Sequence, residues 1–597
     1  MTLFAGIVDP DAAYVIQFME GMRNLSPALP WLKHTDSRLG RLSLSLNSAP
    51  QSPYSTYQGA TGRTAFVLGD IVHQAEMDSA AYLVAQSLDL GPNNLGRQNG
   101  YYIAGMVDEH DAIYLAVDQL GLMPLYYWAN QDRLCFSTSP NAFFYHPGFS
   151  AKADLMGLTG VLLTMHATGN RTVHEDVRRL PPGHLLRWRA GEGVRLTDVN
   201  SLKAHDRYFG WPLAHCQNRI QNSLNESVKR LAELGETSVL LSGGLDSRLV
   251  AGCLRWHLPH KAPVITLGEP ADYEMQCARG VAKTLGWPLN PVPVNLNDYR
   301  KWAPIQAKLE GMGTSFVEFM WWQALETIYG GKSRIMTGLL GDAVMGATQI
   351  AYGLDKQTQE YSFDTQIART NRYGFSAADT SKLLKEPGLG EAIVEELRAE
   401  WNAYEGLPFQ KCWQFDLHHR QRLHVGPAAW RLSFGAWPTL PYTSSEFMEV
   451  MAGMAVPVMG GRRAQYEMLK QKFPKLAVLP LDRSGEDITP VVPTRSWAVK
   501  SQLSKLFEAL APQNNIERRQ YVRHFNVNGT GWQAVRELAE SSRPAAEKIF
   551  DPKVLAAALP TPGVPLHTPD PIIDGARYKT LMGLMMQLGT TIAGVQK

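Results

Sequence analysis

Several features that would assign the chain to a common class of protein are missing from its sequence. The five cysteines are scattered, odd in number and never spaced as Cys-x-x-Cys, which excludes a disulfide framework and a cysteine zinc site. The net charge is only +2 and no dense run of Lys and Arg occurs, so we expect no nucleic acid partner. No apolar stretch is long enough to span a bilayer, and the first residues do not form a secretory signal. We therefore expect a soluble, cytoplasmic protein.

The composition that remains is that of a globular protein with more than one hydrophobic core. Apolar residues make up 45% of the 597 residues and charged residues 19%, and a chain of this length forms roughly two to four domains. Residues 1–205 alternate apolar and polar positions in short runs, for example at 41–46, 112–117 and 183–188. This period of two predicts a first domain built on β-sheet.

A second pattern begins near residue 206, and we assign residues 206–597 to a second domain. A predicted strand at 239–241 leads through a Gly-rich loop into a helix, and the same order repeats after predicted strands at 264–267 and 334–337. Strands that alternate with helices predict an α/β protein with a parallel, doubly wound sheet. Ligands of such sheets lie beyond the carboxyl ends of the strands. The last hundred residues carry no motif that we can interpret.

The segment with the clearest chemistry is Ser-Gly-Gly-Leu-Asp-Ser at residues 242–247. Gly243 and Gly244 remove side chains where a backbone must approach an anion, and the following helix adds its positive N-terminal end. Ser242 and Ser247 supply hydroxyl donors, while Asp246 supplies a carboxylate suited to Mg²⁺. A Gly-Gly turn with Asp capping the next helix is the alternative. The whole hexapeptide favours nucleotide binding, and because no Gly-Lys-Ser/Thr follows it, release of pyrophosphate is favoured over γ-phosphoryl transfer.

A second candidate segment is Thr-Gly-Leu-Leu-Gly-Asp at residues 337–342. Its last residue, Asp342, follows a strand and a Gly-rich turn, so it could complete the ligands of Mg²⁺ together with Asp246. Taken alone, the segment is explained equally well by a strand-ending turn without a ligand. The two acids together predict a metal-assisted pyrophosphate site.

At these residues the sequence resembles the asparagine synthetase family, over at least residues 1–350 and more weakly to about 490. The family's opening Met-Cys-Gly-Ile-Ala-Gly-Ile-Phe-Asp runs without a gap beside residues 1–9, and residues 118–127 and 177–184 resemble two further family segments. The resemblance implies an N-terminal glutaminase-like domain, an αββα sandwich of the Ntn type, followed by an ATP-pyrophosphatase-type synthetase domain with helical additions. It also implies an ATP site at Leu241, Ser242, Gly243, Gly244, Leu245, Asp246, Ser247, Leu267, Thr337 and Gly338.

Two positions depart from the glutaminase of this family. Thr2 stands where the family has its cysteine nucleophile, and Leu68, Gly69 and Asp70 stand where an Asn-Gly-Glu segment binds glutamine. A threonine with a free α-amine can act as a nucleophile, but the missing amide argues against glutamine hydrolysis. We expect the first domain to be a structural relic with Thr2 at the position of the lost nucleophile.

Two groups of relatives, the β-lactam synthetases and the lasso peptide cyclases, also lack that cysteine. In the turn before the second acid the β-lactam relatives carry a Tyr and the asparagine synthetases a Glu, whereas this chain has Leu339. These departures, together with a Trp-rich later region, make the lasso peptide cyclases the nearest resemblance. Trp413, Trp430 and Trp437 either line a groove for an extended peptide or are buried in a helical core.

The cation that the relatives place near pyrophosphate has no clear counterpart. The family's Lys falls near Gly485, with Arg483 as a substitute, and Lys470 and Lys472 are alternatives. Each of these three side chains also fits a solvated helix face or loop. Glu274 matches an acid after the family's second strand, where it either touches nucleotide or substrate or favours a helix N-terminus.

The resemblance as a whole implies a lasso peptide cyclase that uses ATP and Mg²⁺. A side-chain carboxylate of a precursor peptide would be adenylated, the peptide's N-terminal amine would attack, and AMP and pyrophosphate would leave. Asp246 and Asp342 would hold the metal, with Arg483 and Glu274 as further catalytic candidates. Because Leu339 offers no base, another residue or solvent would deprotonate the amine. A leader-binding and protease partner is also implied. The alternatives are another carboxylate–amine ligase, of the β-lactam or asparagine type, and a non-catalytic scaffold.

Overall fold

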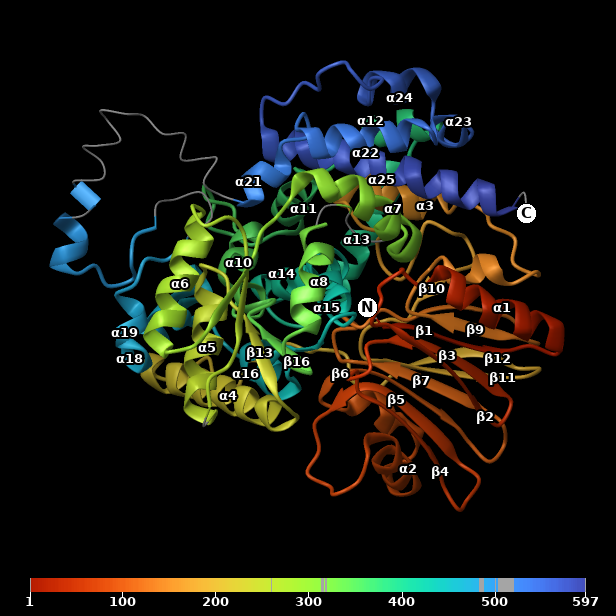
Figure 1. The fold of residues 1–597 in the computed structure, drawn as a ribbon, viewed down its shortest axis with the longest axis horizontal. Helices are drawn as coiled ribbons and strands as arrows, with labels where there is room; N and C mark the ends of the chain where they lie inside the picture. The colour runs from red at the N-terminus through yellow and green to blue at the C-terminus, as the bar shows by residue number, and fades with distance from the viewer. Residues whose placement is uncertain are drawn as a thin grey trace.

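The computed structural model describes the chain apart from residues 1, 259, 313–315, 317–318, 483–487, 500, 503–519 and 596–597. Its strands form three sheets. Figure 1 shows the strands of the first two hundred residues on one side of the molecule and a separate set of strands, wrapped in helices, on the other. The C-terminal helices α22 (Thr530–Glu540) and α25 (Pro571–Val595) lie along the top of this view.

The first two sheets are antiparallel and belong to the N-terminal third of the chain. One has the order β10-β8-β9-β1-β3-β2 and the other β12-β11-β7-β6-β5-β4. The strands of the first sheet are β1 (Leu3–Val8), β2 (Lys33–Leu39), β3 (Leu42–Ser48), β8 (Tyr126–Ala129), β9 (Leu134–Ser137) and β10 (Arg178–Arg179). Those of the second are β4 (Tyr54–Gln58), β5 (Thr64–Ile71), β6 (Gly100–Val107), β7 (Ile113–Val117), β11 (His184–Arg189) and β12 (Gly193–Asp198).

Side-chain alternation along β5 explains how these sheets form layers. Phe66 and Leu68 point into the core shared with the other sheet, where the Phe66 ring lies 5.2 Å from that of Phe4. Ala65 and Val67 face the opposite way and pack against α2 (Ser79–Leu90). Helix α1 (Ala12–Leu25) covers the outer face of the first sheet. The result is the predicted four-layer αββα sandwich.

The third sheet is parallel, with the order β15-β14-β13-β16-β17. Its strands are β13 (Thr237–Leu240), β14 (Val264–Leu267), β15 (Leu289–Val292), β16 (Arg334–Thr337) and β17 (Trp437–Thr439). Helices cover both faces: α5 (Leu245–His257) and α6 (Tyr273–Leu285) on one, α8 (Met320–Tyr329) and α15 (Pro427–Leu432) on the other. The chain winds outward from β13 in both directions, so the predicted doubly wound topology is present.

Apart from α3, which belongs to the first 205 residues, the remaining helices extend this second unit. They are α3 (Leu155–Thr164), α4 (Leu213–Glu233), α7 (Tyr299–Glu310), α9 (Gly341–Val344), α10 (Ala347–Gly353), α11 (Phe363–Asn371), α12 (Ala377–Leu384), α13 (Leu389–Ala403), α14 (Pro408–Asp416), α16 (Ser445–Ala452), α17 (Val456–Met459), α18 (Arg463–Lys472), α19 (Pro474–Ala477), α21 (Gln520–Phe525), α23 (Arg543–Ala546) and α24 (Pro552–Ala558). Short 3-10 segments are η1 (Pro92–Arg97), η2 (Ala142–Tyr145), η3 (Leu296–Asp298), η5 (Pro441–Thr443) and η6 (Gly460–Arg462), and η4 (Leu417–Val425) is a π-helix. None of the helices in the described residues is both long and apolar enough to cross a membrane.

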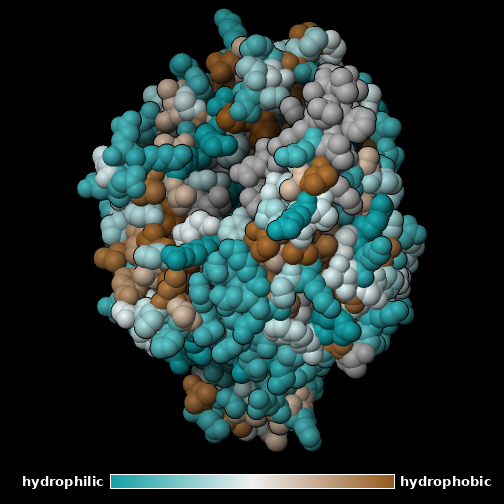
Figure 2. All heavy atoms as spheres, turned by 90° about the vertical axis from the view of Figure 1, so that its left-hand side faces the viewer, coloured by the Kyte–Doolittle hydropathy of each residue, from teal (hydrophilic) through white to brown (hydrophobic). Residues whose placement is uncertain are grey.

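The face over α4, α6 and α18 is mostly hydrophilic, with apolar residues scattered across it (Figure 2). The three tryptophans that could have lined a peptide groove do not reach the surface: Trp413, Trp430 and Trp437 are all buried. Trp413 donates its indole N–H to the carbonyl oxygens of Ala343 and Val344. The core interpretation is confirmed, and the groove interpretation is wrong for these three residues.

Candidate active site

The two motif segments of the sequence meet at one edge of the parallel sheet. β13 and β16 are neighbours, and residues 241–244 and 338–340 follow them at their carboxyl ends. The chain continues from β13 to β14 on one side, whereas β16 lies on the other, so this edge is the topological switch point where such sheets bind ligands.

The loop at 242–244 is closed by its own hydroxyl groups. The Ser242 N–H donates to Ser247 Oγ at 3.1 Å, and the Gly244 N–H donates to Ser242 Oγ at 3.2 Å. Gly244 is the N-cap of α5, and no side chain caps this helix. The first N–H groups of α5 therefore keep their capacity to bind an anion such as pyrophosphate.

The glycines are required by protein packing as well as by any ligand. A Cβ on Gly243 would lie 2.9 Å from the Cα of Glu274 and 2.9 Å from the Cβ of Asp482. A Cβ on Gly338 would lie 2.4 Å from the backbone nitrogen of Ser247. Gly243 thus lets the loop approach α6, and Gly338 lets the end of β16 approach the first turn of α5. This close approach brings the two motifs together.

Asp246 and Asp342 lie on the first turns of α5 and α9, and one guanidinium lies between them. Arg462 NH1 is 3.6 Å from Asp246 Oδ2, and Arg462 NH2 is 3.4 Å from Asp342 Oδ2. Gln465 donates its amide to Asp246 Oδ1, and the Tyr442 hydroxyl donates to the Asp246 carbonyl oxygen at 3.0 Å. Asp246 and Asp342, which we predicted to act together, are therefore close enough to contact one cation.

The surroundings of Asp246 disfavour its charged form. Burial raises the pKa of Asp246 to about 7; Arg462 opposes the rise, and the neighbouring charge of Asp342 adds to it. The described residues contain no group of three or more His, Cys, Asp or Glu side chains that could hold a metal ion by themselves. Two carboxylates beside an uncapped helix N-terminus do fit Mg²⁺, because this ion binds through one or two carboxylates together with phosphate oxygens.

Sequence reasoning missed the residues that complete the site. Arg462 and Gln465 lie about 120 residues beyond Asp342, and no motif marks them. The two candidate lysines contact neither acid: Lys470 pairs with Glu467 on the exposed face of α18, and Lys472 is exposed. Arg483 and Gly485 lie outside the described residues.

Other predicted positions surround the loop. Leu267 ends β14 beside the loop strand, Glu274 lies in the first turn of α6, and Leu339 donates its N–H to Thr337 Oγ1 at 3.2 Å. Arg248, the residue after the motif, fixes the loop through hydrogen bonds from its buried guanidinium. It donates to the carbonyl oxygen of Gly243 at 3.3 Å and to three carbonyl oxygens of residues 476–480. The roles of Leu267 and Glu274 in binding a nucleotide remain predictions.

Thr2 has no catalytic neighbourhood. It is fully buried, its backbone N–H donates to Ser433 Oγ at 3.0 Å, and its carbonyl oxygen accepts from the Trp430 indole at 3.2 Å. Its hydroxyl has no hydrogen-bond partner within the described part of the chain. The start of β1 is thus joined to the segment around α15, and among the described residues neither a base nor an oxyanion donor contacts the hydroxyl.

The segment that replaces the glutamine-binding residues is also engaged by the second unit. Asp70 accepts two hydrogen bonds from Arg334 at the start of β16, at 2.6 and 2.9 Å. A Cβ on Gly69 would lie 2.6 Å from the Trp437 ring. This part of β5 is therefore an interface between the antiparallel sandwich and the parallel sheet.

Comparison with known proteins finds two family models. One family model, described as a glutamine amidotransferase domain, matches residues 72–197, and another, described as asparagine synthase, matches residues 219–427. The glutamine-hydrolyzing asparagine synthetase 3 of Bacillus subtilis (strain 168) is 25% identical over 210 residues, which cover 34% of this chain and 33% of that protein. The chain thus matches about a third of the length of this curated relative.

Two solved structures show a distant likeness. One is a glutamine phosphoribosylpyrophosphate amidotransferase from B. subtilis in complex with ADP and GMP, at a TM-score of 0.24 and 14% identity over 49% of this chain and 66% of that chain. The other is an allosteric regulatory enzyme of purine biosynthesis, at a TM-score of 0.24 and 14% identity over 49% of this chain and 65% of that one. With the two family matches and the observed sheets, the predicted fold class is confirmed.

Proposed function

We propose that this chain, a member of the asparagine synthetase family by its two domain matches and its curated relative, is an ATP-dependent ligase that closes an amide bond within a peptide. The observation that carries the proposal is the pair Asp246 and Asp342, brought together with Arg462 beside the uncapped N-terminus of α5. This arrangement suits a nucleotide cleaved to AMP and pyrophosphate.

In the proposed reaction, a carboxylate of the peptide attacks the α-phosphate of ATP, and pyrophosphate leaves. The N–H groups of the loop and of α5 would bind the pyrophosphate oxygens, and Asp246 and Asp342 would hold Mg²⁺. When bound, Mg²⁺ supplies neutralisation of the charge on the leaving group. Arg462 would exchange its contacts with the two carboxylates for contacts with phosphate oxygens, because a guanidinium binds both groups well.

In the second step an amine attacks the activated acyl carbon, and AMP leaves. Glutamine is disfavoured as the source of the amine because Thr2 is buried without catalytic neighbours and Asp70 is bound by Arg334. A small-ring product is disfavoured because Leu339 provides neither the Tyr nor the Glu of the relatives. These departures support the N-terminal amine of a lasso-type precursor peptide, with holding both peptide ends together as the protein's main contribution.

The test is an assay with a precursor peptide that has a free N-terminal amine and an internal Asp or Glu. We expect pyrophosphate release that depends on ATP and Mg²⁺, together with loss of one water from the peptide by mass spectrometry. An N-acetylated peptide separates the two steps, because it should support ATP–pyrophosphate exchange without forming a ring. Asp246→Asn should abolish both signals, and Asp379→Asn, on the exposed face of α12, should retain them.

The outcomes separate the rivals. Turnover of a small amino acid or β-amino acid without any peptide would replace the cyclase by another carboxylate–amine ligase. No carboxylate-dependent pyrophosphate release from any substrate would leave a non-catalytic scaffold. The proposal also includes a leader-binding and protease partner, and genes for a short precursor peptide and a cysteine-protease-like protein beside this gene would support it.

A further inference from the structure

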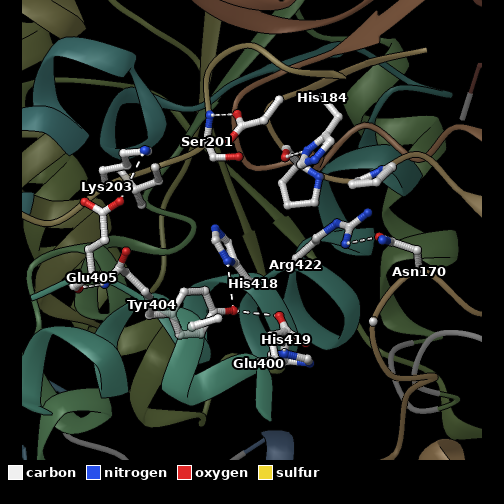
Figure 3. A pocket seen from close by; sticks show the side chains of 17 residues that line it. Asn170, His184, Ser201, Lys203, Glu400, Tyr404, Glu405, His418, His419 and Arg422 are labelled. Atoms are coloured by element: carbon white, nitrogen blue, oxygen red, sulfur yellow. Dashed lines mark hydrogen bonds and ion pairs between the residues drawn. The ribbon is translucent and has the colours of Figure 1, made fainter. Parts of the chain in front are cut away.

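A polar cavity of about 370 Å³ lies between the N-terminal sandwich and the helices that follow residue 389, with His184 of β11 and His418 of η4 in its lining (Figure 3). The two glutamates of this lining contact basic neighbours, Glu400 with His419 at 3.0 Å and Glu405 with Lys203 at 3.3 Å. The described lining thus matches much of its own charge and does not indicate a ligand. The C-terminal helices, by contrast, make a contact that leads to the candidate nucleotide site.

Helix α21 is anchored by three helices that surround its last turn. The carbonyl oxygen of His524 accepts hydrogen bonds from the Trp532 indole of α22 at 2.7 Å and from Lys579 Nζ of α25 at 2.9 Å. His524 Nδ1 also contacts the Tyr299 hydroxyl of α7. All four of these residues are buried. The backbone beside His524 is therefore fixed by α7, α22 and α25 together.

Arg523, the residue before that anchor, reaches from α21 to the loop between β14 and α6. Its NH1 lies 2.5 Å from Asp272 Oδ1, and its NH2 lies 2.8 Å from Asp272 Oδ2. The Asp272 side chain is 1% exposed and that of Arg523 27%. A two-point contact between a guanidinium and a carboxylate fixes orientation as well as distance. Figure 1 shows α21 at the end of the C-terminal helical layer on the side where α6 lies.

Asp272 closes the loop that Arg523 contacts. It is the N-cap residue of α6, yet its side chain does not cap that helix. Instead, Asp272 Oδ2 accepts the Glu269 N–H at 2.6 Å, and the Asp272 N–H donates to the Glu269 carbonyl oxygen at 3.0 Å. The carboxylate also lies over Gly268, where φ is 126° and an added Cβ would be 2.8 Å from Oδ2. One carboxylate therefore organises residues 268–272 and receives Arg523 from outside.

The loop at 268–272 borders the candidate nucleotide site. It follows Leu267 at the carboxyl end of β14, and β14 is the neighbour of β13 in the parallel sheet. Ligands of such sheets bind beyond these strand ends. At its other end the loop leads into α6, where the Cα of Glu274 would lie 2.9 Å from a Cβ on Gly243. A shift of this loop would therefore move the surface against which the Ser-Gly-Gly segment packs.

We infer that Arg523 is a positioning residue for the nucleotide and acts through Asp272 on the loop at 268–272. The inference rests on the proposed function, because it takes the ligand of this site to be ATP. It assigns a role to the C-terminal helices, which hold one wall of the ATP site in place through α21. A wall that is already in place lowers the cost of ordering on binding, so its loss weakens the binding of ATP.

The experiment is calorimetric titration of the full-length chain, in the presence of Mg²⁺, with the α,β-methylene analogue of ATP, which cannot release pyrophosphate. Arg523→Gln should raise the dissociation constant by about tenfold. Arg523→Lys keeps the charge but not the two-point contact, so it should raise the constant by less, and it serves if Arg523→Gln does not fold. Arg300→Gln is the matched control, because Arg300 pairs with Glu537 in an exposed contact between α7 and α22. It should bind as the wild type does.

Two further measurements separate positioning from a general loss of structure. Asp272→Asn should weaken binding as Arg523→Gln does, and the double variant should bind no more weakly than Arg523→Gln, because both residues act through one contact. In the ATP–pyrophosphate exchange assay, Arg523→Gln should raise the KM for ATP by about tenfold and leave kcat and the KM for the peptide unchanged. A merely structural role would lower kcat or the melting temperature without this split.

The outcomes distinguish this inference from the proposed function. If the wild type binds the analogue and folded Arg523→Gln and Asp272→Asn bind it equally well, the inference alone is overturned. Equal weakening by Arg300→Gln, or additive losses in the double variant, also overturns it. If the wild type binds the analogue but no carboxylate supports pyrophosphate exchange, the ligase proposal fails, while weaker binding by Arg523→Gln still supports the positioning role. No binding by the wild type at millimolar concentration overturns both.

Discussion

Arg462 lies between the two acids of the candidate site, and its backbone conformation is unusual. Its φ is 58°, in the left-handed region that a residue with a side chain seldom adopts, and it follows Gly461 with φ 64°. A non-glycine residue held there stores strain of about 1 kcal/mol or more, and such strain concentrates at functional sites. The turn aims the guanidinium at both Asp246 and Asp342.

We predict that Arg462→Ala lowers the rate of pyrophosphate release by about a hundredfold, because one preorganised cation at a developing charge contributes two to three orders of magnitude. Arg463→Ala is the matched control, since that side chain is exposed and makes only a long hydrogen bond of 3.4 Å to the carbonyl of Pro457. Steady-state pyrophosphate assays measure both variants. Equal rates for Arg462→Ala and the wild type would remove Arg462 from the site.

The raised pKa of Asp246 has a consequence for stability. In the unfolded chain an Asp titrates near 3.9, whereas burial raises the pKa of Asp246 to about 7 in the folded chain. Its contribution to stability is therefore complete below about pH 4 and is lost as the pH rises through about 7. Asp246→Asn should inactivate the protein yet raise the melting temperature of the ligand-free chain at pH 8, with no such gain at pH 4.

The free-energy gain has an upper limit on the order of 4 kcal/mol, from about three pKa units at 1.4 kcal/mol each. Thermal melts at the two pH values measure it, and Asp379→Asn on the exposed face of α12 is the control. A melting temperature at pH 8 that falls in the Asp246 variant would contradict this account of the carboxyl.

At the scale of elements, β5 and β16 are joined by one ion pair. Asp70 and Arg334 form two hydrogen bonds, and their side chains are 7% and 14% exposed. Removal of one partner from a largely buried pair leaves an uncompensated charge, which costs about 3 kcal/mol or more. The pair therefore fixes the sandwich against the edge of the parallel sheet where β16 begins.

We predict that Asp70→Ala and Arg334→Ala each lower the free energy of unfolding by about 3 kcal/mol, and that the double variant loses far less than their sum. Denaturant unfolding of the four proteins measures the coupling. The exposed pair Asp379 and Lys382, on α12, should give less than about 1 kcal/mol in the same cycle. Additive losses for Asp70 and Arg334 would show that the ion pair does not couple the two strands.

At the scale of the whole molecule, the N-terminal sandwich contacts the unit built on the parallel sheet through Thr2 and the end of β5. Thr2 is linked to Trp430 and Ser433, Gly69 packs against Trp437, and Asp70 is bound by Arg334. A single change at position 2 alters none of these contacts.

We accordingly predict that Thr2→Cys does not restore glutamine hydrolysis. The new thiol would be buried, where desolvation disfavours the thiolate that acts as nucleophile. Release of glutamate and ammonia from glutamine measures the outcome, with the wild type as the baseline. Glutamine turnover by Thr2→Cys above that baseline would contradict the assignment of the first unit as a relic.

Strands and helices with a strong local sequence pattern could be predicted. The period of two identified β3, β7 and β11, and the strand–loop–helix order identified β13 with α5 and β14 with α6. β15 and β17 were missed because a four-residue strand and a three-residue strand contain too few positions to show a period, and β17 is surrounded by helices. The sequence also did not predict how the C-terminal helix α25 packs, because its apolar residues do not gather on one clear face.

Residue type and local order alone predict the class of chemistry that we propose, because residues 242–247 and Asp342 each lie in a short motif. They also show a threonine at position 2, where the glutaminases that the sequence resembles have a cysteine. The folded structure was needed to place Arg462 and Gln465 beside the acidic pair, Trp437 and Arg334 against β5, and His184 and His418 in one cavity. The physical reason is sequence separation: contacts between residues tens to hundreds of positions apart depend on how sheets and helices pack, and no local pattern encodes that packing.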